Sequence, residues 1–219
     1  TPESARALAY ECLNDEQKST LERSWQLCFS TLLAESDRAR VTIYFRGGNP
    51  ELSIRLSESA IRTRTELSLP PIVDELARKP NGLVIITGPT GVGKTTTFNY
   101  MIDRVNGESR KKIITIEDPI EYTHISKRAI VVQQEVLTDV HGFYQALVHV
   151  LRQDPDVIGV GEMRDRETMY TALMAAETGH LVIATLHTPD AVQSVQRVIS
   201  AFPEGQQAEV RYMLANTLQ

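Results

Sequence analysis

The sequence predicts an α/β protein with a mostly parallel sheet, preceded by a smaller α+β region. Three observations support this prediction. From Gly82 onward, short and continuously apolar segments alternate with amphipathic helical segments, a glycine-rich signature stands between one such pair, and the first third of the chain has a different pattern. Continuously apolar strands are typical of a sheet buried on both faces. With 219 residues, 42% of them apolar, the chain can form one full domain and a smaller companion.

We expect the chain to divide at residue 78. Residues 1–78 combine a small N-terminal domain with a linker, and residues 79–219 form the second domain. Lys79-Pro80-Asn81-Gly82 supplies the hinge, because Pro, Asn and Gly favour turns. Gly47-Gly48-Asn49-Pro50 is an earlier turn signal. The elements expected in the N-terminal part are helices over 4–13 and 16–23, strands over 25–33 and 41–45, and a short helix over 72–77.

The second domain alternates strands with helices, which predicts parallel connections. The expected strands cover 83–87, 113–116, 130–132, 157–160 and 181–186. Helical spacing of apolar residues predicts helices over 98–105, 143–151 and 210–218. Asn106-Gly107 is expected to end the first of these helices. Asp165 is expected to cap a helix that reaches residue 177, and Thr188 to cap another with Pro189 at its first position.

The most specific signal is a full match to GxxxxGK[ST] over 88–95, between a predicted strand and a predicted helix. In such a loop, backbone N–H groups and the positive end of the helix face phosphate groups. Lys94 adds a full charge, and the Thr95 hydroxyl suits Mg²⁺ beside a nucleotide. No Asn-Lys-x-Asp segment occurs, which disfavours guanine. The predicted nucleotide-binding residues are Pro89, Thr90, Gly91, Val92, Gly93, Lys94, Thr95 and Thr96.

Acidic and imidazole side chains follow three other predicted strands. Glu117-Asp118, Glu162 and His187 each come just after a strand end, and ligands of open parallel sheets lie beyond those ends. A carboxylate there can orient the attacking water or hold a water on Mg²⁺. The alternative is that these residues are helix caps or solvated strand ends. His180 begins its strand at the opposite edge, where closing the preceding helix is an equally good explanation.

Composition limits the classes of function. A net charge of −5 argues against a surface built for nucleic acid, which usually carries a basic excess. No window approaches the roughly 18 consecutive apolar residues of a membrane-spanning helix. Thr1 opens no charged-then-apolar signal segment, so we expect a cytosolic protein. Cys12 and Cys28 lack CxxC spacing, which favours buried reduced thiols over a zinc site or disulfide framework.

Four segments together resemble the motifs of a known family. They are residues 88–97, Ile114-Thr115-Ile116-Glu117-Asp118-Pro119-Ile120-Glu121-Tyr122, Asp154-Pro155-Asp156-Val157-Ile158 with Gly161-Glu162-Met163-Arg164-Asp165, and Thr178-Gly179-His180-Leu181 with Thr185-Leu186-His187-Thr188. In this order they resemble the Walker A, Asp box, Walker B and His box of the type II/type IV secretion ATPase superfamily. Gly-Glu-Met-Arg-Asp is most similar to the branch that retracts type IV pili in twitching motility. Residues 2–29 and 37–41 resemble the second half of the family's PAS-like N-terminal domain.

The resemblance implies a RecA-like P-loop NTPase core preceded by a partial PAS-like domain. It implies Mg²⁺-dependent ATP hydrolysis by a homo-hexameric motor, in the cytoplasm and peripheral to the inner membrane. The motor would power type IV pilus retraction together with an inner-membrane pilus or secretion platform protein. Glu117 and Glu162 would serve water activation and the metal, with Thr95 and Glu162 at Mg²⁺, and His187 would sense the γ-phosphate.

The family also supplies arginines from the N-terminal domain to a neighbouring subunit's site. Arg40 and Arg55 are the best matches, and the alternative is that each is a solvated surface residue. An arginine delivered in this way can be worth about 10³- to 10⁵-fold in rate. The rival candidates are Arg38, Arg46, Arg62 and Arg64.

The resemblance has gaps that leave alternatives open. Residues 34–46 are only loosely similar, and the first half of the N-terminal domain and the C-terminal helical domain are expected to lie outside this chain. Pilus extension and effector secretion are alternatives within the superfamily. A nucleic-acid translocase is disfavoured by the acidic balance and the lack of basic-aromatic segments. An assembly subunit without turnover is disfavoured by the presence of Glu117 and Glu162.

Overall fold

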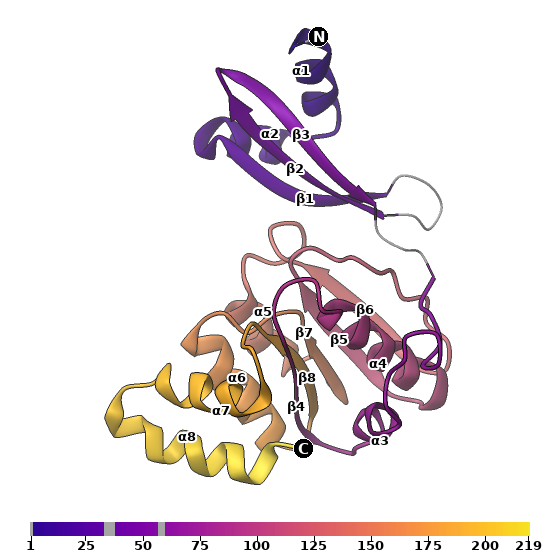
Figure 1. The fold of residues 1–219 in the computed structure, drawn as a ribbon, viewed down its shortest axis with the longest axis vertical. Coiled ribbons are helices and arrows are strands. Elements are labelled where there is room, and N and C mark those ends of the chain that lie inside the picture. Colours follow the sequence, from indigo (N-terminus) through magenta and orange to yellow (C-terminus); the bar gives the residue numbers. More distant parts are fainter. Residues whose placement is uncertain (1, 33–37, 57–59) are drawn as a thin grey trace. The chain divides into compact units, whose positions relative to one another are not determined.

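The computed structural model describes residues 2–32, 38–56 and 60–219. These residues form two compact units (Figure 1). The N-terminal unit comprises residues up to Ala60 together with Glu121–Thr123, and the larger unit comprises Ile61–Ile120 and His124–Gln219.

The N-terminal unit packs two helices on one antiparallel sheet. Its elements are α1 (Pro2–Glu11), α2 (Asp15–Ser24), β1 (Gln26–Leu32), β2 (Arg38–Arg46) and β3 (Asn49–Leu56), and the strand order is β1-β2-β3. Leu21 of α2 and Phe29 and Ile43 of the sheet belong to its apolar core. Both predicted helices and both predicted strands are present. Leu33, the predicted end of the first strand, lies outside the described residues.

Strand β3 was missed from the sequence. The turn signal was assigned to residues 47–50, but only Gly47 and Gly48 have left-handed backbone angles (φ of 59° and 80°). Asn49 and Pro50 already belong to β3, with Pro50 opposite Phe45 of β2. The two glycines alone therefore make the turn. The segment after them alternates polar and apolar residues, with Leu52, Ile54 and Leu56 at every second position, so it carried a strand signal that the sequence interpretation overlooked.

The larger unit is a five-stranded parallel sheet with helices on both faces (Figure 1). Its strands are β4 (Gly82–Thr87), β5 (Lys112–Glu117), β6 (Ile130–Glu135), β7 (Val157–Val160) and β8 (Leu181–Leu186), in the order β4-β8-β7-β5-β6. Its helices are α3 (Ile72–Ala77), α4 (Lys94–Glu108), α5 (Phe143–Val150), α6 (Arg166–Glu177), α7 (Ala191–Ser200) and α8 (Glu204–Thr217). All five predicted strands are present, as is the short helix predicted over 72–77.

Alternate strand residues enter two separate apolar cores. Ile113 packs with α3 and α4 on one face, whereas Ile114 packs with α5, α6 and α8 on the other. Burial of both faces explains why these strands are continuously apolar. The parallel arrangement also directs the carboxyl ends of all five strands to the same edge of the sheet.

Two predicted helix ends differ from the structure. Helix α4 continues through Asn106-Gly107 to Glu108, because the buried Asn106 amide bonds to the backbone of the 125–127 segment and does not end the helix. Helix α7 is capped by Asp190, which accepts from Gln193 N, and not by Thr188. The Thr188 hydroxyl contacts the Thr87 and Ser194 hydroxyls, so it is already engaged elsewhere.

Residues 61–77 pack within the larger unit. Leu67 and Leu69 contact the core beneath α4, and Asp74 accepts a hydrogen bond from Tyr100 at 2.5 Å. The two units therefore divide between Ala60 and Ile61, whereas the sequence placed residues 61–78 with the N-terminal part as a linker. Both cysteines are free, but Cys12 is exposed, so the expected burial of its thiol was wrong.

Candidate functional site

The loop between β4 and α4 has the backbone that an anion-binding loop needs. Gly88, Gly91 and Gly93 have φ angles of 145°, 85° and 96°, which side-chain-bearing residues rarely adopt. A Cβ on Gly88 would lie 2.6 Å from Val92 Cγ2, so the loop closes tightly on itself. No side chain caps the start of α4. The unpaired N–H groups of its first turn are therefore available to an anion.

Lys94 is held inside this loop, with 8% of its surface exposed. Its Nζ donates to the carbonyl oxygens of Gly88 at 2.8 Å and Pro89 at 3.0 Å. It also lies 3.3 Å from His187 Nδ1. The ammonium group is thus fixed at the mouth of the loop, beside the end of β8.

The end of β7 joins the same cluster. His187 Nε2 lies 3.4 Å from Glu162 Oε1, and Arg164 Nε donates to Glu162 Oε2 at 2.6 Å. Arg164 also contacts Asp118 Oδ2 at 3.3 Å. The hydrogen bond with Glu162 is the main reason that the pKa of Arg164 is raised above its ordinary value. A continuous chain of polar contacts therefore runs from Lys94 to the segment that follows β5.

Glu117, the last residue of β5, is buried with 3% exposure. Its Oε1 accepts from Thr115 Oγ1 at 2.7 Å and from Gln133 Nε2 at 3.0 Å. Gly161, which follows the adjacent strand β7, approaches so closely that a Cβ there would lie 3.2 Å from Glu117 Cα. The predicted carboxylates Glu117 and Glu162 therefore follow neighbouring strands at the edge of the sheet that also carries Lys94.

The residues at this edge fit a nucleoside triphosphate with Mg²⁺. The glycine-rich loop and Lys94 suit phosphate, and the Thr95 hydroxyl with the Glu162 and Asp118 carboxylates provides the oxygen donors that Mg²⁺ prefers. In the part of the chain that the structure describes, no three His, Cys, Asp or Glu side chains are grouped to hold a metal by themselves.

His180 has the structural role considered for it. Its ring Nδ1 lies 3.0 Å from the Ala175 carbonyl oxygen, and its backbone N–H donates to the same oxygen at 3.1 Å. It therefore closes the end of α6, next to Gly179, whose φ of 100° ends the helix.

The candidate arginines lie in the N-terminal unit. Arg40 and Arg55 are directly opposite each other on β2 and β3, where Arg55 is exposed and Arg40 is half-buried. Arg40 Nε donates to Cys28 Sγ at 3.2 Å. Contacts within their own units engage Arg38 with Ser30, Arg46 with Glu51, and Arg64 with Asp74.

Sequence reasoning missed several side chains near the site. Gln133 lies one residue beyond the strand predicted over 130–132, which in the structure extends to Glu135. Asn99 and His124 are buried polar residues. Asn99 carried a weak signal, because it lies among the apolar residues of the predicted helix over 98–105.

Residues 53–215 match the family model described as Type II/IV secretion system protein. The chain belongs to this family. The match confirms the resemblance inferred from the four motifs.

Proteins of type IV pili and twitching motility are among the relatives of this chain. The type IV pilus retraction ATPase PilT of Pseudomonas aeruginosa is 44% identical over 213 residues, covering 97% of this chain and 62% of the relative. A twitching motility protein of Neisseria gonorrhoeae is 43% identical, covering 94% of this chain and 55% of the relative. Each relative is thus longer than this chain, which spans less than two thirds of its length.

Solved structures confirm the predicted α/β fold class of the family member. The pilus retraction motor PilT with bound ADP has a TM-score of 0.94 and 45% identity, covering 100% of this chain and 64% of that chain. The Legionella pneumophila ATPase DotB has a TM-score of 0.86 and 28% identity, covering 97% of this chain and 61% of that chain. Among the described residues, no helix combines the length and apolarity required to cross a bilayer.

Proposed function

We propose that this chain carries the catalytic site of a Mg²⁺-dependent ATPase that drives type IV pilus retraction. The observation that carries the proposal is the contact chain from Lys94 through His187 to Glu162, which joins the phosphate-binding loop to the ends of β8 and β7. Phosphoryl transfer needs positioning and charge stabilisation more than covalent chemistry, and this edge of the sheet supplies both.

Each residue of the site has a role in this proposal. Lys94 and the N–H groups at the start of α4 bind the phosphates. Thr95 and Glu162 hold Mg²⁺, which supplies neutralisation of the developing charge when bound. Glu117 orients the attacking water. His187 lies between Lys94 and Glu162, so it is placed to respond to whether a γ-phosphate is present.

The wider assembly is part of the same proposal. The names and titles of the relatives, a pilus retraction ATPase and a pilus retraction motor, support a motor that works with an inner-membrane pilus or secretion platform protein. We propose a homo-hexamer at the cytoplasmic face of the membrane, with Arg40 and Arg55 reaching a neighbouring subunit's site. Because Arg40 and Arg55 are cross-strand partners, their side chains lie on the same face of the sheet, which would let both reach the same site of a neighbouring subunit.

The catalytic test uses the full-length protein. Lys94→Ala should abolish phosphate release. Glu162→Gln should still bind ATP while its kcat falls by about 10²- to 10³-fold, the usual cost of losing one electrostatic stabiliser of the transition state. Glu177→Gln, the same change at an exposed position in the last turn of α6, is the matched control and should turn over ATP normally. Equal hydrolysis by Glu162→Gln would remove this carboxylate from the catalytic site.

The direction of force requires a cellular test. A deletion strain that gains surface pili and loses twitching would support retraction. A strain that loses its pili would indicate pilus extension, and normal piliation with defective protein export would indicate a secretion ATPase.

A further inference from the structure

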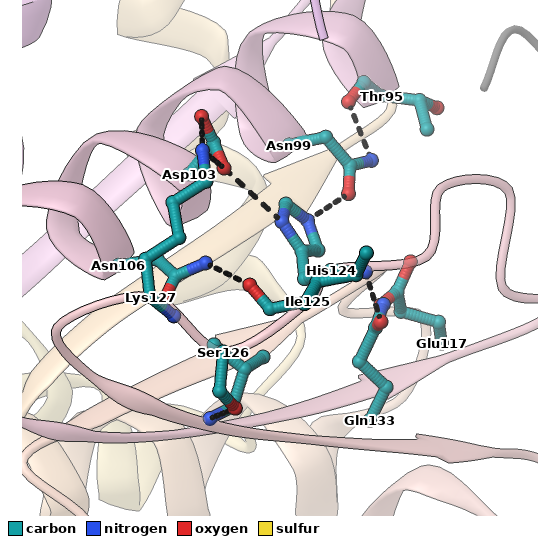
Figure 2. Close-up of polar contacts among 11 residues, drawn as sticks. Thr95, Asn99, Asp103, Asn106, Glu117, His124, Ile125, Ser126, Lys127 and Gln133 are labelled. Atoms are coloured by element: carbon teal, nitrogen blue, oxygen red, sulfur yellow. Dashed lines mark hydrogen bonds and ion pairs between the residues drawn. The ribbon is translucent and has the colours of Figure 1, made fainter. Parts of the chain in front are cut away.

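A chain of hydrogen bonds connects the start of α4 with the end of β5 (Figure 2). Asn99 Nδ2 donates to the Thr95 carbonyl oxygen at 2.9 Å, and Asn99 Oδ1 lies 2.8 Å from His124 Nε2. The His124 backbone N–H donates to Gln133 Oε1 at 2.7 Å, and Gln133 Nε2 donates to Glu117 Oε1 at 3.0 Å. The chain thus runs from the phosphate-binding helix to the carboxylate proposed to orient water.

Backbone groups determine how the two amides in this chain are oriented. The Asn99 amide must direct its NH₂ group to the Thr95 carbonyl, so its oxygen accepts a hydrogen bond from His124 Nε2–H. The Gln133 amide must direct its oxygen to the His124 N–H, so its NH₂ group faces Glu117. A flipped amide at either position would place two donors or two acceptors together.

Three of the four linked side chains are buried, and Gln133 is half-buried. Asn99 is fully buried, and His124 and Glu117 are 8% and 3% exposed. Water cannot readily replace a lost partner at such positions, so each contact is costly to break. The other ring nitrogen of His124 faces Asp103, with Nδ1 at 3.9 Å from Oδ1 (Figure 2).

The hydrogen bond from Gln133 connects Glu117 to a different strand, whereas the one from Thr115 does not. Thr115 also donates to Glu117 Oε1, but Thr115 and Glu117 belong to the same strand and move together. Gln133 lies on β6, and its amide hydrogen-bonds both to Glu117 and to the backbone N–H of His124.

We propose that Gln133 is a positioning residue for Glu117, and that hydrogen bonds through His124 and Asn99 connect Gln133 to α4. The inference rests on the proposed ATP hydrolysis. A shift of α4 on nucleotide binding would then be transmitted to the carboxylate, and the carboxylate would be held in one orientation toward the attacking water. Because Gln133 acts on Glu117 and not on the nucleotide, its loss should lower kcat and spare nucleotide affinity.

The decisive variant is Gln133→Glu in the full-length protein. Glutamate keeps an acceptor for the His124 N–H but presents an oxygen to Glu117 in place of the amide donor. We expect kcat to fall by about 10- to 100-fold, with affinity for fluorescent methylanthraniloyl-ADP within about twofold of wild type.

Two further variants separate positioning from folding. Gln133→Met removes the donor without adding charge, so it should lower kcat and leave nucleotide affinity within about twofold of wild type. Gln145→Glu makes the same charge change at an exposed site on α5 and should behave as wild type.

Wild-type kcat in both Gln133 variants would overturn the inference while leaving the proposed function intact. A parallel loss of kcat and nucleotide affinity would also overturn it, because that pattern indicates a structural role. No hydrolysis by wild-type full-length protein would refute the proposed function, and the positioning role would fall with it.

Discussion

Replacing Gly159 by alanine would press a methyl group into the contact between β7 and α4. A Cβ at this position would lie 2.8 Å from Phe98 Cζ, 2.8 Å from Thr115 Cγ2 and 3.3 Å from Phe98 Cε2. Favourable carbon–carbon contacts are about 3.5–4.0 Å, so the two shortest contacts are too close by about 0.7 Å. Phe98 and Thr115 are 1% and 0% exposed, so neither side chain can swing into solvent.

The expected destabilisation follows from two opposing effects. Overpacking of this kind costs about 1–3 kcal/mol. Alanine recovers about 0.4–1 kcal/mol, because it reduces the entropy of the unfolded chain. The free energy of unfolding should therefore fall by about 1–2 kcal/mol, which lowers Tm by roughly 2–8 °C for a chain of this size.

Thermal unfolding followed by circular dichroism measures this effect. Gly107→Ala is the matched control, because Gly107 lies inside α4 and its added Cβ would meet nothing within 4 Å beyond the backbone of its own helix, so this variant should gain stability. Phe98→Leu in the Gly159→Ala background should cost less than Phe98→Leu alone, since the two changes relieve each other. A Gly159→Ala protein as stable as wild type, or strictly additive effects in the double variant, would refute the packing argument.

Two other predictions concern the site and its support. Gly161→Ala places a Cβ 3.2 Å from Glu117 Cα, so we expect kcat to fall. The loss of Tm should be smaller than the loss that Gly159→Ala produces. An unchanged kcat would contradict the close approach of Gly161 to Glu117. The pKa of Asp103 is held below its ordinary value by the His124 ring and by Lys127, whose Nζ lies 2.7 Å from Asp103 Oδ1. A lowered carboxyl pKa contributes stability that is complete above the unfolded value of about 3.9 and is lost as the pH falls through the folded value. In urea unfolding at about pH 6, Asp103→Asn should therefore be less stable than wild type. The difference in unfolding free energy between the two proteins should close below about pH 4. A difference that does not depend on pH would contradict this assignment.

Local chemistry explains which parts of the fold were predictable. The five strands of the larger unit were found because burial on both faces makes each one continuously apolar, and Asp165 was found because a cap acts within one turn, where it accepts from Thr168 N at 2.7 Å. The β3 strand and the cap of α7 were not found. The β3 segment does carry a local signal, the alternation of Leu52, Ile54 and Leu56 with polar residues, and it was overlooked beside the turn signal. The cap of α7 could not be found locally, because contacts with the distant Thr87 and with Ser194 withdraw the Thr188 hydroxyl from capping.

By itself the sequence determined the family, the phosphate-binding loop and the placement of Glu117, Glu162 and His187 at one edge of the sheet. That placement was predictable because parallel strands direct their carboxyl ends to the same edge, whatever order they adopt. Only the tertiary structure decided which side chains touch. Gln133 meets Glu117 because β6 is the neighbour of β5 in the sheet, and Asn99 meets His124 because the segment after β5 returns across α4. Partners of this kind depend on strand order and on the path of a connecting segment, neither of which is encoded in any short stretch of residues.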